Sequence, residues 1–468
     1  MALIIKPNKP VATRPIKSGQ PLGAILGSLG LDRCIPLIHG AQGCSAFAKV
    51  FFIQHFHEPV PLQSTAMDPI TTIMGSDDNI LQALATLCER SNPRIVVLMS
   101  SGLAEAQGAE MTRAIKAFRL SYPKHDRIEV VHLNTPDFYG SMENGFATLV
   151  EALIEQLVPE QAVRTLRKKR VNLLLSHMLT PGDIELIRSY VEAFGLQPVL
   201  VPDLAHSMDG HLARGDYLPV SQGGTDVLAL RQLGQSAATL VIGPSLARAG
   251  QLLQKRTGVE SHSFAHLMTL AEMDRFILTL QRLAERPVPE WIERSRGQLQ
   301  DAMIDTHTWV NGRRMAIGAE ADLLMAWVSF AQSVGLQPCS VVAPVNQPWL
   351  AGLPVESVRI GDLQDLVDGI DPRASGPLTA RAVDLLLSNS HGADLAAELD
   401  IPLLRIGFPI YDRMGEFRRT RQGYAGMRDT LFEIGNLMQE RCHGRAVHHS
   451  PLKQQFTAEL MAEELRYV

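Results

Sequence analysis

One cysteine, Cys44, stands where a metal-binding thiol would be useful. It closes the segment Pro36–Cys44 (PLIHGAQGC), which follows an apolar run and precedes a predicted helix over Ala46–His55. Loops at the carboxyl ends of parallel strands bind ligands, and two glycines let the backbone approach a ligand closely. A helix start would also stabilise the thiolate, which suits a metal ligand. The alternative is a small buried residue that packs like alanine, and the local pattern alone favours it.

The remaining cysteines indicate structural roles. They are widely scattered, and no C-x-x-C occurs in the chain. A metal site built by one chain usually clusters its thiols along the sequence, and a disulfide framework is unexpected in a protein of this size and class. We therefore expect inert thiols or a site that another chain completes. The four cysteines are Cys34, Cys88, Cys339 and Cys442.

Three other segments could carry chemistry. His55 and His57 are two positions apart at a predicted helix end and point to different sides, so we expect cationic side chains near the helix carbonyls rather than a metal pair. Gly223–Thr225 could present amides to an anion ahead of a predicted helix at Asp226–Leu233, but a turn with an N-cap is the favoured interpretation. His391-Gly392 has the same two alternatives.

The elements that position these residues follow from repeated apolar runs, each followed by a helical stretch. Continuous apolar strands that alternate with helices are typical of parallel sheets covered on both faces. We therefore predict an α/β fold with three doubly wound, Rossmann-like domains. The predicted strands are Ile35–Ile38, Ile95–Ser100, Ile128–Leu133, Val171–Ser176, Pro198–Val201, Leu240–Gly243, Met315–Gly318, Ser340–Ala343, Val383–Ser388 and Pro402–Ile406.

The domain organisation follows from length and from a repeat. At about 150 residues per domain, 468 residues suggest three domains. The tetrapeptide GLQP ends a predicted helix at Gly195–Pro198 and again at Gly335–Pro338, as glycine and proline commonly do. We expect domain I at 1–165 with the Cys44 loop, domain II at 166–285, domain III at 286–440 and a C-terminal tail at 441–468. The basic stretch 155–170 is predicted to be a linker, and 285–310 a connecting helix.

Composition excludes several function classes. The formal net charge of −5 gives no strongly basic footprint for nucleic acid, and 46% hydrophobic with 20% charged residues fits a globular protein. No apolar run reaches the roughly 18 to 20 residues of a membrane span, and no targeting segment is visible. We expect a cytoplasmic protein that binds neither membrane nor nucleic acid. The P-loop, G-x-G-x-x-G, H-E-x-x-H and G-x-S-x-G motifs are also absent from the sequence.

A whole-chain resemblance emerges from motifs taken in order. Gly40–Cys44 followed by His55–Pro59 (HFHEP) resembles the first P-cluster cysteine region of the nitrogenase molybdenum–iron protein β chain and its relatives. The chain is thus similar to β-type members of the nitrogenase component 1 superfamily. Further matches are Thr135–Ser141 (TPDFYGS), Gly223–Thr225, Asn389–Gly392 (NSHG), Arg405–Arg413 (RIGFPIYDR) and Gly423–Gly426 (GYAG).

Departures from that pattern point to one branch of the superfamily. Where the catalytic β chain has two further cluster cysteines, this sequence has Leu62 and Gly102, and Asp137 replaces a serine that can also ligate the P-cluster. An eight-iron P-cluster could not be held in the usual way. Protochlorophyllide-reductase-like subunits typically have an aspartate where this chain has Cys44. Ser207–Leu212 and Asp301–Arg314 instead resemble members that build the iron–molybdenum cofactor.

The resemblance implies an assembly scaffold rather than a catalyst acting alone. It implies a heterotetramer with two copies each of this chain and NifE, on which a NifB-derived precursor matures with the help of the nitrogenase iron protein before transfer to apo-nitrogenase. Cys44 would be the one ligand from this chain to an intersubunit [4Fe-4S] cluster, and the precursor would be held mainly by NifE. The alternatives are a nitrogenase-like oxidoreductase β subunit, a vanadium-linked paralogue and a metal-free binding protein.

Overall fold

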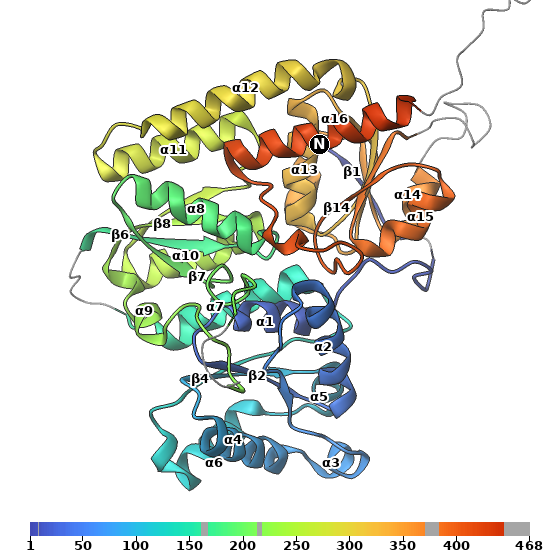
Figure 1. Cartoon of the computed structure of the whole chain (residues 1–468). Helices are drawn as coiled ribbons and strands as arrows, with labels where there is room; N and C mark the ends of the chain where they lie inside the picture. The colour runs from blue at the N-terminus through green and yellow to red at the C-terminus, as the bar shows by residue number, and fades with distance from the viewer. Residues whose placement is uncertain (8, 161–166, 213–217, 370–382, 444–468) are drawn as a thin grey trace, which may run out of the picture.

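The computed structural model describes residues 1–7, 9–160, 167–212, 218–369 and 383–443. Within these ranges the chain forms three parallel sheets flanked by helices (Figure 1), which confirms the predicted α/β class. Each sheet reverses its strand order around a central strand, as doubly wound sheets do. Among the helices of the described residues, none is long and apolar enough to cross a lipid bilayer. Short 3-10 turns are η1 (Pro123–His125), η2 (Leu233–Gln235), η3 (Pro244–Leu246), η4 (Pro348–Gly352), η6 (Ser390–Gly392) and η7 (Glu416–Arg418).

The first sheet has the order β3-β2-β4-β5. Its central strands β2 and β4 are buried throughout, because alternate residues of β4 point into different cores. Val97 packs in the core that contains α1 and α7, whereas Val96 packs in the core that contains α4 and α6. The elements are α1 (Gln20–Leu29), β2 (Cys34–His39), α2 (Gln42–Phe56), β3 (Gln63–Ser64), α3 (Pro69–Met74), α4 (Asp77–Ser91), β4 (Ile95–Ser100), α5 (Gly102–Gln107), α6 (Met111–Ser121), β5 (Glu129–Leu133) and α7 (Met142–Leu157).

The second sheet has the order β7-β6-β8-β9. The predicted linker at 155–170 is wrong at both ends, because α7 continues to Leu157 and β6 begins at Arg167; residues 161–166 lie outside the described part. The first three residues of β6 are exposed, so their charge conceals the strand in the sequence. The elements are β6 (Arg167–Leu175), α8 (Pro181–Ala193), β7 (Gln197–Val201), α9 (Val227–Arg231), β8 (Ser236–Ile242), α10 (Ala247–Thr257), β9 (Glu260–Phe264) and α11 (Leu270–Ala284).

The third sheet has the order β1-β12-β11-β10-β13-β14. Its edge strand β1 comes from the N-terminus and pairs with β12, so the first residues of the range 1–165 join this sheet rather than domain I. The connecting helix predicted at 285–310 is present as α12, and α16 packs along it (Figure 1). The elements are β1 (Leu3–Ile5), α12 (Glu290–Val310), β10 (Arg314–Gly318), α13 (Ala321–Ser333), β11 (Gln337–Ala343), β12 (Ser357–Ile360), α14 (Leu363–Gly369), β13 (Leu385–Ser388), α15 (Ala393–Glu398), β14 (Leu403–Arg405) and α16 (Gly423–His443).

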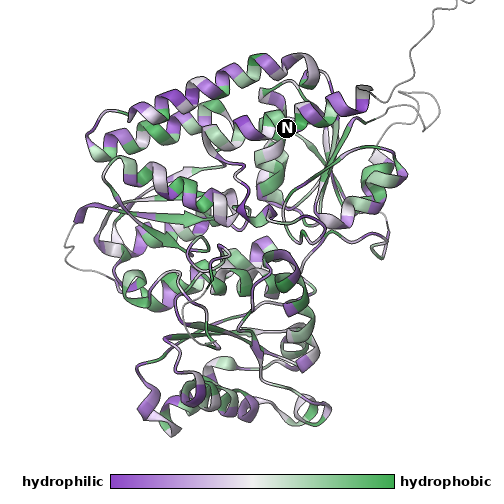
Figure 2. Ribbon diagram, viewed as in Figure 1, coloured by the Kyte–Doolittle hydropathy of each residue, from purple (hydrophilic) through white to green (hydrophobic). Residues whose placement is uncertain are grey.

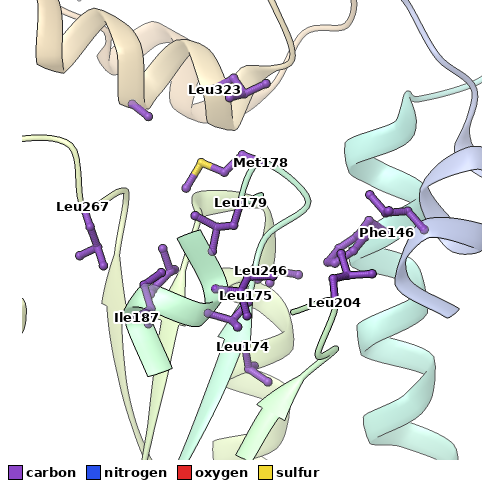
Figure 3. Packing of buried hydrophobic residues seen from close by; sticks show 14 of the residues in the cluster. Phe146, Leu174, Leu175, Met178, Leu179, Ile187, Leu204, Leu246, Leu267 and Leu323 are labelled. Carbon is purple, nitrogen blue, oxygen red and sulfur yellow. The ribbon is translucent and has the colours of Figure 1, made fainter. Parts of the chain in front are cut away.

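The three sheets share one continuous apolar core. Figure 2 shows strands in apolar colours and hydrophilic residues on the outer helices. Phe146 on α7, Met178 after β6 and Leu323 on α13 belong to the same buried cluster and gather between the domains (Figure 3). Helices α1 and α7 cross closely, because a Cβ at Gly23 would lie 1.8 Å from the Met142 carbonyl oxygen. This close crossing fixes the start of α7 against the first sheet.

Candidate functional site

The carboxyl ends of β2, β4 and β5 bring three loops to one edge of the first sheet. The Ser101 amide donates to the His39 carbonyl over 3.1 Å, and the Ser101 hydroxyl donates to the same oxygen over 2.8 Å. One residue further on, the Gly102 amide donates to Asp137 Oδ2 over 3.1 Å. The Cys44 loop, Gly102 and Asp137 therefore lie at the sheet edge where ligands bind in doubly wound folds.

Cys44 is the third residue of α2, and its side chain is exposed. Its amide donates to the Ala41 carbonyl over 3.2 Å, and Ala41 itself is the N-cap, without a side-chain hydrogen bond to the helix. The interpretation of Cys44 as a buried, alanine-like residue is therefore wrong. The thiol is placed where a ligand or a second chain can reach it.

The electrostatics around Cys44 disfavour a free thiolate. Partial burial and then the nearby Asp137 carboxylate raise the pKa of the Cys44 thiol, although two backbone hydrogen bonds act in the opposite direction. The expectation that the helix start would stabilise the thiolate is therefore wrong for the isolated chain, because desolvation and the negative charge outweigh it. A bound metal would reverse this balance, since a cation stabilises the thiolate and offsets the carboxylate.

Asp137→Asn should make Cys44 more reactive. Removing the carboxylate charge lowers the pKa of the thiol, so a larger fraction is thiolate at a fixed pH below that pKa. The rate of iodoacetamide labelling at pH 8 should rise about threefold to tenfold, since one pKa unit is worth a factor of ten in thiolate at most. Mass spectrometry of the Cys44 peptide gives the rate, and Cys44→Ala gives the background. An unchanged rate would contradict the proposed influence of Asp137.

His55 is not the cationic helix-end residue that the sequence predicts. Burial lowers its pKa to about 4, so the ring is neutral at physiological pH. Its Nδ1 accepts a hydrogen bond of 3.0 Å from the Ile410 amide, and its ring lies 5.0 Å, centroid to centroid, from that of Phe408. His57 ends the helix in a left-handed conformation with φ of 57°. The contact with Ile410 ties α2 to the loop after β14 and thereby fixes the helix that carries Cys44.

The two glycine-containing turns are structural. The Asp226 side chain caps α9, which confirms the favoured interpretation of Gly223–Thr225 as a turn before an N-cap. The Thr225 amide donates to the Gly30 carbonyl over 2.8 Å, so this turn joins the second domain to the first. His391 lies in η6, where its amide donates to the Asn389 side chain over 3.1 Å, again as a turn.

Comparison with known proteins identifies the family. A family model described as nitrogenase component 1 type oxidoreductase matches residues 19–439. The chain belongs to the nitrogenase component 1 family. It is 58% identical to the nitrogenase iron-molybdenum cofactor biosynthesis protein NifN of Klebsiella pneumoniae, over 97% of each chain. It is also 43% identical to the protein of the same name from Nostoc sp. strain PCC 7120, over 93% of this chain and 95% of that one.

Solved nitrogenase structures confirm the family fold. The structure described as nitrogenase Cp1 at pH 6.5 superposes with a TM-score of 0.87 at 27% identity, covering 94% of this chain and 96% of that chain. A second chain, described as nitrogenase Cp1 at pH 5, has a TM-score of 0.64 at 12% identity and supports the fold alone. The predicted three-domain, component 1 β-subunit-like architecture is therefore confirmed.

Of the three positions that the sequence resemblance compares with cluster cysteines, Cys44 is the one that offers a thiol. Leu62 is 0% exposed and belongs to the apolar core, and Gly102 begins α5 with the Asp137 carboxylate beside it. Burial raises the pKa of the Cys88 thiol to about 11, and it also raises that of Cys34, so both thiols are protonated core residues. Cys339 is partly buried in β11, and the side chain of Cys442 lies outside the described residues.

The helix that carries Cys44, α2, also exposes apolar side chains, and the sequence reasoning missed them. On α2, Ala48, Phe52 and Phe56 face the core at spacings of four. A second row on the same helix is exposed, and Phe47, next to Cys44 on that helix, leaves 67% of its surface uncovered. We call Phe47, Val50 and Ile53 the α2 apolar face. Three further exposed apolar residues lie in the segments that follow β4 and β5; they are Leu103, Phe138 and Tyr139. A helix that is apolar on two sides is the signal that could have revealed the α2 apolar face.

Proposed function

We propose that this chain is a scaffold subunit for biosynthesis of the nitrogenase iron–molybdenum cofactor, and that Cys44 provides one ligand to a [4Fe-4S] cluster shared with a NifE partner. The single observation that carries the proposal is one exposed thiol at the open edge of the first sheet, with Leu62 and Gly102 where thiols would complete a larger cluster. The cofactor-biosynthesis names of the similar proteins support the same assignment.

The donor set fits a shared cluster and not one held by this chain alone. A four-iron cluster takes about four cysteine thiolates, and Cys44 supplies one from this side, so the partner would supply three. Bound there, the cluster would supply one-electron redox chemistry at the subunit interface. Without iron, the Asp137 carboxylate disfavours the Cys44 thiolate. With iron bound, the same negative charge would help to balance the positive charge of the metal.

The α2 apolar face supports the partner part of the proposal. Exposed apolar side chains next to a ligand residue mark a surface that another chain covers. We propose a heterotetramer with two copies of each subunit, in the cytoplasm, with the NifB-derived precursor held mainly by NifE. The matured cofactor would pass to apo-nitrogenase after steps that involve the nitrogenase iron protein.

The decisive experiment is anaerobic co-purification with NifE, followed by iron analysis and EPR spectroscopy. Cys44→Ala should lower the iron content by about four atoms per pair and remove the interfacial four-iron signal. Cys88→Ala is the matched control, because it removes a buried thiol on α4 and should leave the iron unchanged. A Cys44→Ala complex that keeps its interfacial cluster would refute the ligand assignment, and substrate reduction at nitrogenase-like rates would refute the scaffold.

A further inference from the structure

A group of ionisable side chains lies where the three domains meet, and the proposed function uses none of it. Glu143 is near the start of α7, His177 follows β6, and Asp322 is in the first turn of α13. One potential ligand atom from each of these three residues lies within 4.8 Å of the other two. Each side chain comes from a different domain. Phe146, Met178 and Leu323, which are near these three residues in the sequence, belong to the buried apolar cluster drawn in Figure 3.

Hydrogen bonds hold the two carboxylates of Glu143 and Asp322 in place. Asp322 Oδ2 accepts from the Ser176 hydroxyl over 2.6 Å and from the Ser245 hydroxyl over 2.5 Å. The Asp322 amide in turn donates to Glu143 Oε2 over 2.8 Å. A Cβ at Gly243 would lie 2.7 Å from Asp322 Oδ2, so glycine lets α13 approach the second sheet this closely. The surrounding residues therefore hold these carboxylates in fixed positions, as residues around a metal site do.

Two buried polar atoms of this group remain without a hydrogen-bond partner among the described residues. Glu143 is 0% exposed, yet its Oε1 finds no hydrogen-bond donor among the described residues. The buried Nε2 of His177 likewise has no partner in the described part of the chain, while Nδ1 lies 3.3 Å from the Ser176 hydroxyl. Buried polar atoms are almost always paired, with protein, water or an ion. These atoms therefore point to a ligand.

Burial makes the carboxyls of this group costly to ionise unless a cation is bound. Glu143 and Asp322 are fully buried, and Glu320, which accepts a 2.6 Å hydrogen bond from Ser141, adds a third carboxyl. Burial raises the pKa of Asp322 to about 6 and that of Glu320 to about 7, and it raises that of Glu143 well above its usual value. Burial also lowers the pKa of His177 to about 3, so the imidazole is neutral, as a metal ligand must be. The exposed Lys17 lowers the pKa of Glu320, against the larger effect of burial.

We propose that Glu143, His177 and Asp322 bind one divalent transition-metal cation at the junction of the three domains. Two carboxylates and one imidazole suit zinc, manganese or iron(II) better than calcium or magnesium, which prefer oxygen donors throughout. Such an ion would neutralise the buried carboxylates and fix the relative orientation of the domains. The site shares no residue with the Cys44 loop, and it would stand even if the scaffold assignment failed.

The test measures metal binding by the full-length chain with Cys44→Ala, because the exposed thiol would itself bind zinc. Protein expressed with added zinc or manganese should carry one ion per chain by mass spectrometry after prolonged dialysis against metal-free buffer. X-ray absorption spectroscopy of the bound zinc should show only nitrogen and oxygen ligands at about 2.0–2.1 Å, including imidazole. Sulfur ligands, fully hydrated zinc or the absence of retained metal would overturn the proposal.

Variants then assign the site. Glu143→Gln in the same background should lose the retained ion, and Ser245→Ala, which only loosens Asp322, should weaken binding by about tenfold. The control is Asp209→Asn, because Asp209 and His211 form a carboxylate–imidazole pair outside this group and should not affect the retained ion. Retention of metal by Glu143→Gln would refute the assignment. If that variant does not fold, the Ser245→Ala affinity and the ligand set of the parent decide the matter.

Discussion

Replacing Arg421 with methionine should lower the free energy of unfolding by about 3 kcal/mol, because it leaves two poorly solvated carboxylates without their main partner. The guanidinium, whose side chain is 9% exposed, lies 2.7 Å from Glu416 and 2.5 Å from Glu433. The Arg421 amide also donates to the buried Asp183 carboxylate at the start of α8 over 2.6 Å. The residue thus lies where the second domain contacts the segment that leads into α16.

The matched control is Arg419→Met. Arg419 also contacts Glu433 and lies 3.7 Å from Glu416, but its side chain is 48% exposed. Exposed ion pairs contribute about 0 to 1 kcal/mol, so this variant should change stability little. Chemical denaturation followed by circular dichroism measures both variants. Equal effects of the two substitutions would show that burial of Arg421 is not what makes its ion pairs important.

The ion pair between Arg421 and Glu433 also makes the effect of Arg421→Met on stability depend on pH. Burial would raise the pKa of Glu433, but its ion pairs with Arg421 and Arg419 hold the pKa below its usual 4.5. A carboxyl whose pKa is lowered by folding contributes stability that is fully present above its unfolded pKa and is lost as pH falls through the folded value. The stability difference between wild type and Arg421→Met should therefore be constant near pH 7 and shrink below pH 4.5.

The central strands could be predicted from the sequence because their burial is local and continuous. Strands such as β4 are apolar at every position, which is visible without knowledge of their neighbours. Strands β1, β3, β9 and β12 were missed, because each keeps partly or fully exposed residues that break the apolar pattern, and all but β12 lie at a sheet edge. The location of β1 in the third sheet depends on its pairing with β12, some 350 residues away in the chain.

The residues of the candidate site also differ in whether the sequence alone could predict them. Cys44 could be found because its loop, strand and helix are contiguous in the sequence. The neutral state of His55 could not, because it results from burial in the tertiary structure, where Ile410 of a different domain contacts the ring. The group of Glu143, His177 and Asp322 was also beyond reach, since three domains each contribute one side chain. Chemistry assembled from distant segments requires the tertiary structure.

A charge on the α2 apolar face should abolish assembly without unfolding the subunit. Phe47 is exposed and packs edge-on against Phe51 with ring centroids 4.9 Å apart, so Phe47→Asp removes little buried surface in the isolated chain. In a complex the aspartate would be buried without a partner, next to the Cys44 thiol and Asp137. Removal of a central aromatic contact typically costs about 2–4 kcal/mol of binding free energy, or roughly 30-fold to 1,000-fold in Kd.

Leu120→Asp provides the comparison that isolates the surface from the substitution. Leu120 lies on α6, is 85% exposed and belongs to a helix that packs with α4 rather than with the Cys44 loop. Both variants should keep the circular dichroism spectrum and melting temperature of the parent, whereas Phe47→Asp alone should fail to co-purify with NifE. Loss of co-purification in both variants would indicate a general effect of surface charge. Retention in both would place the partner on another face, and the three ligands that Cys44 requires would then have to come from elsewhere.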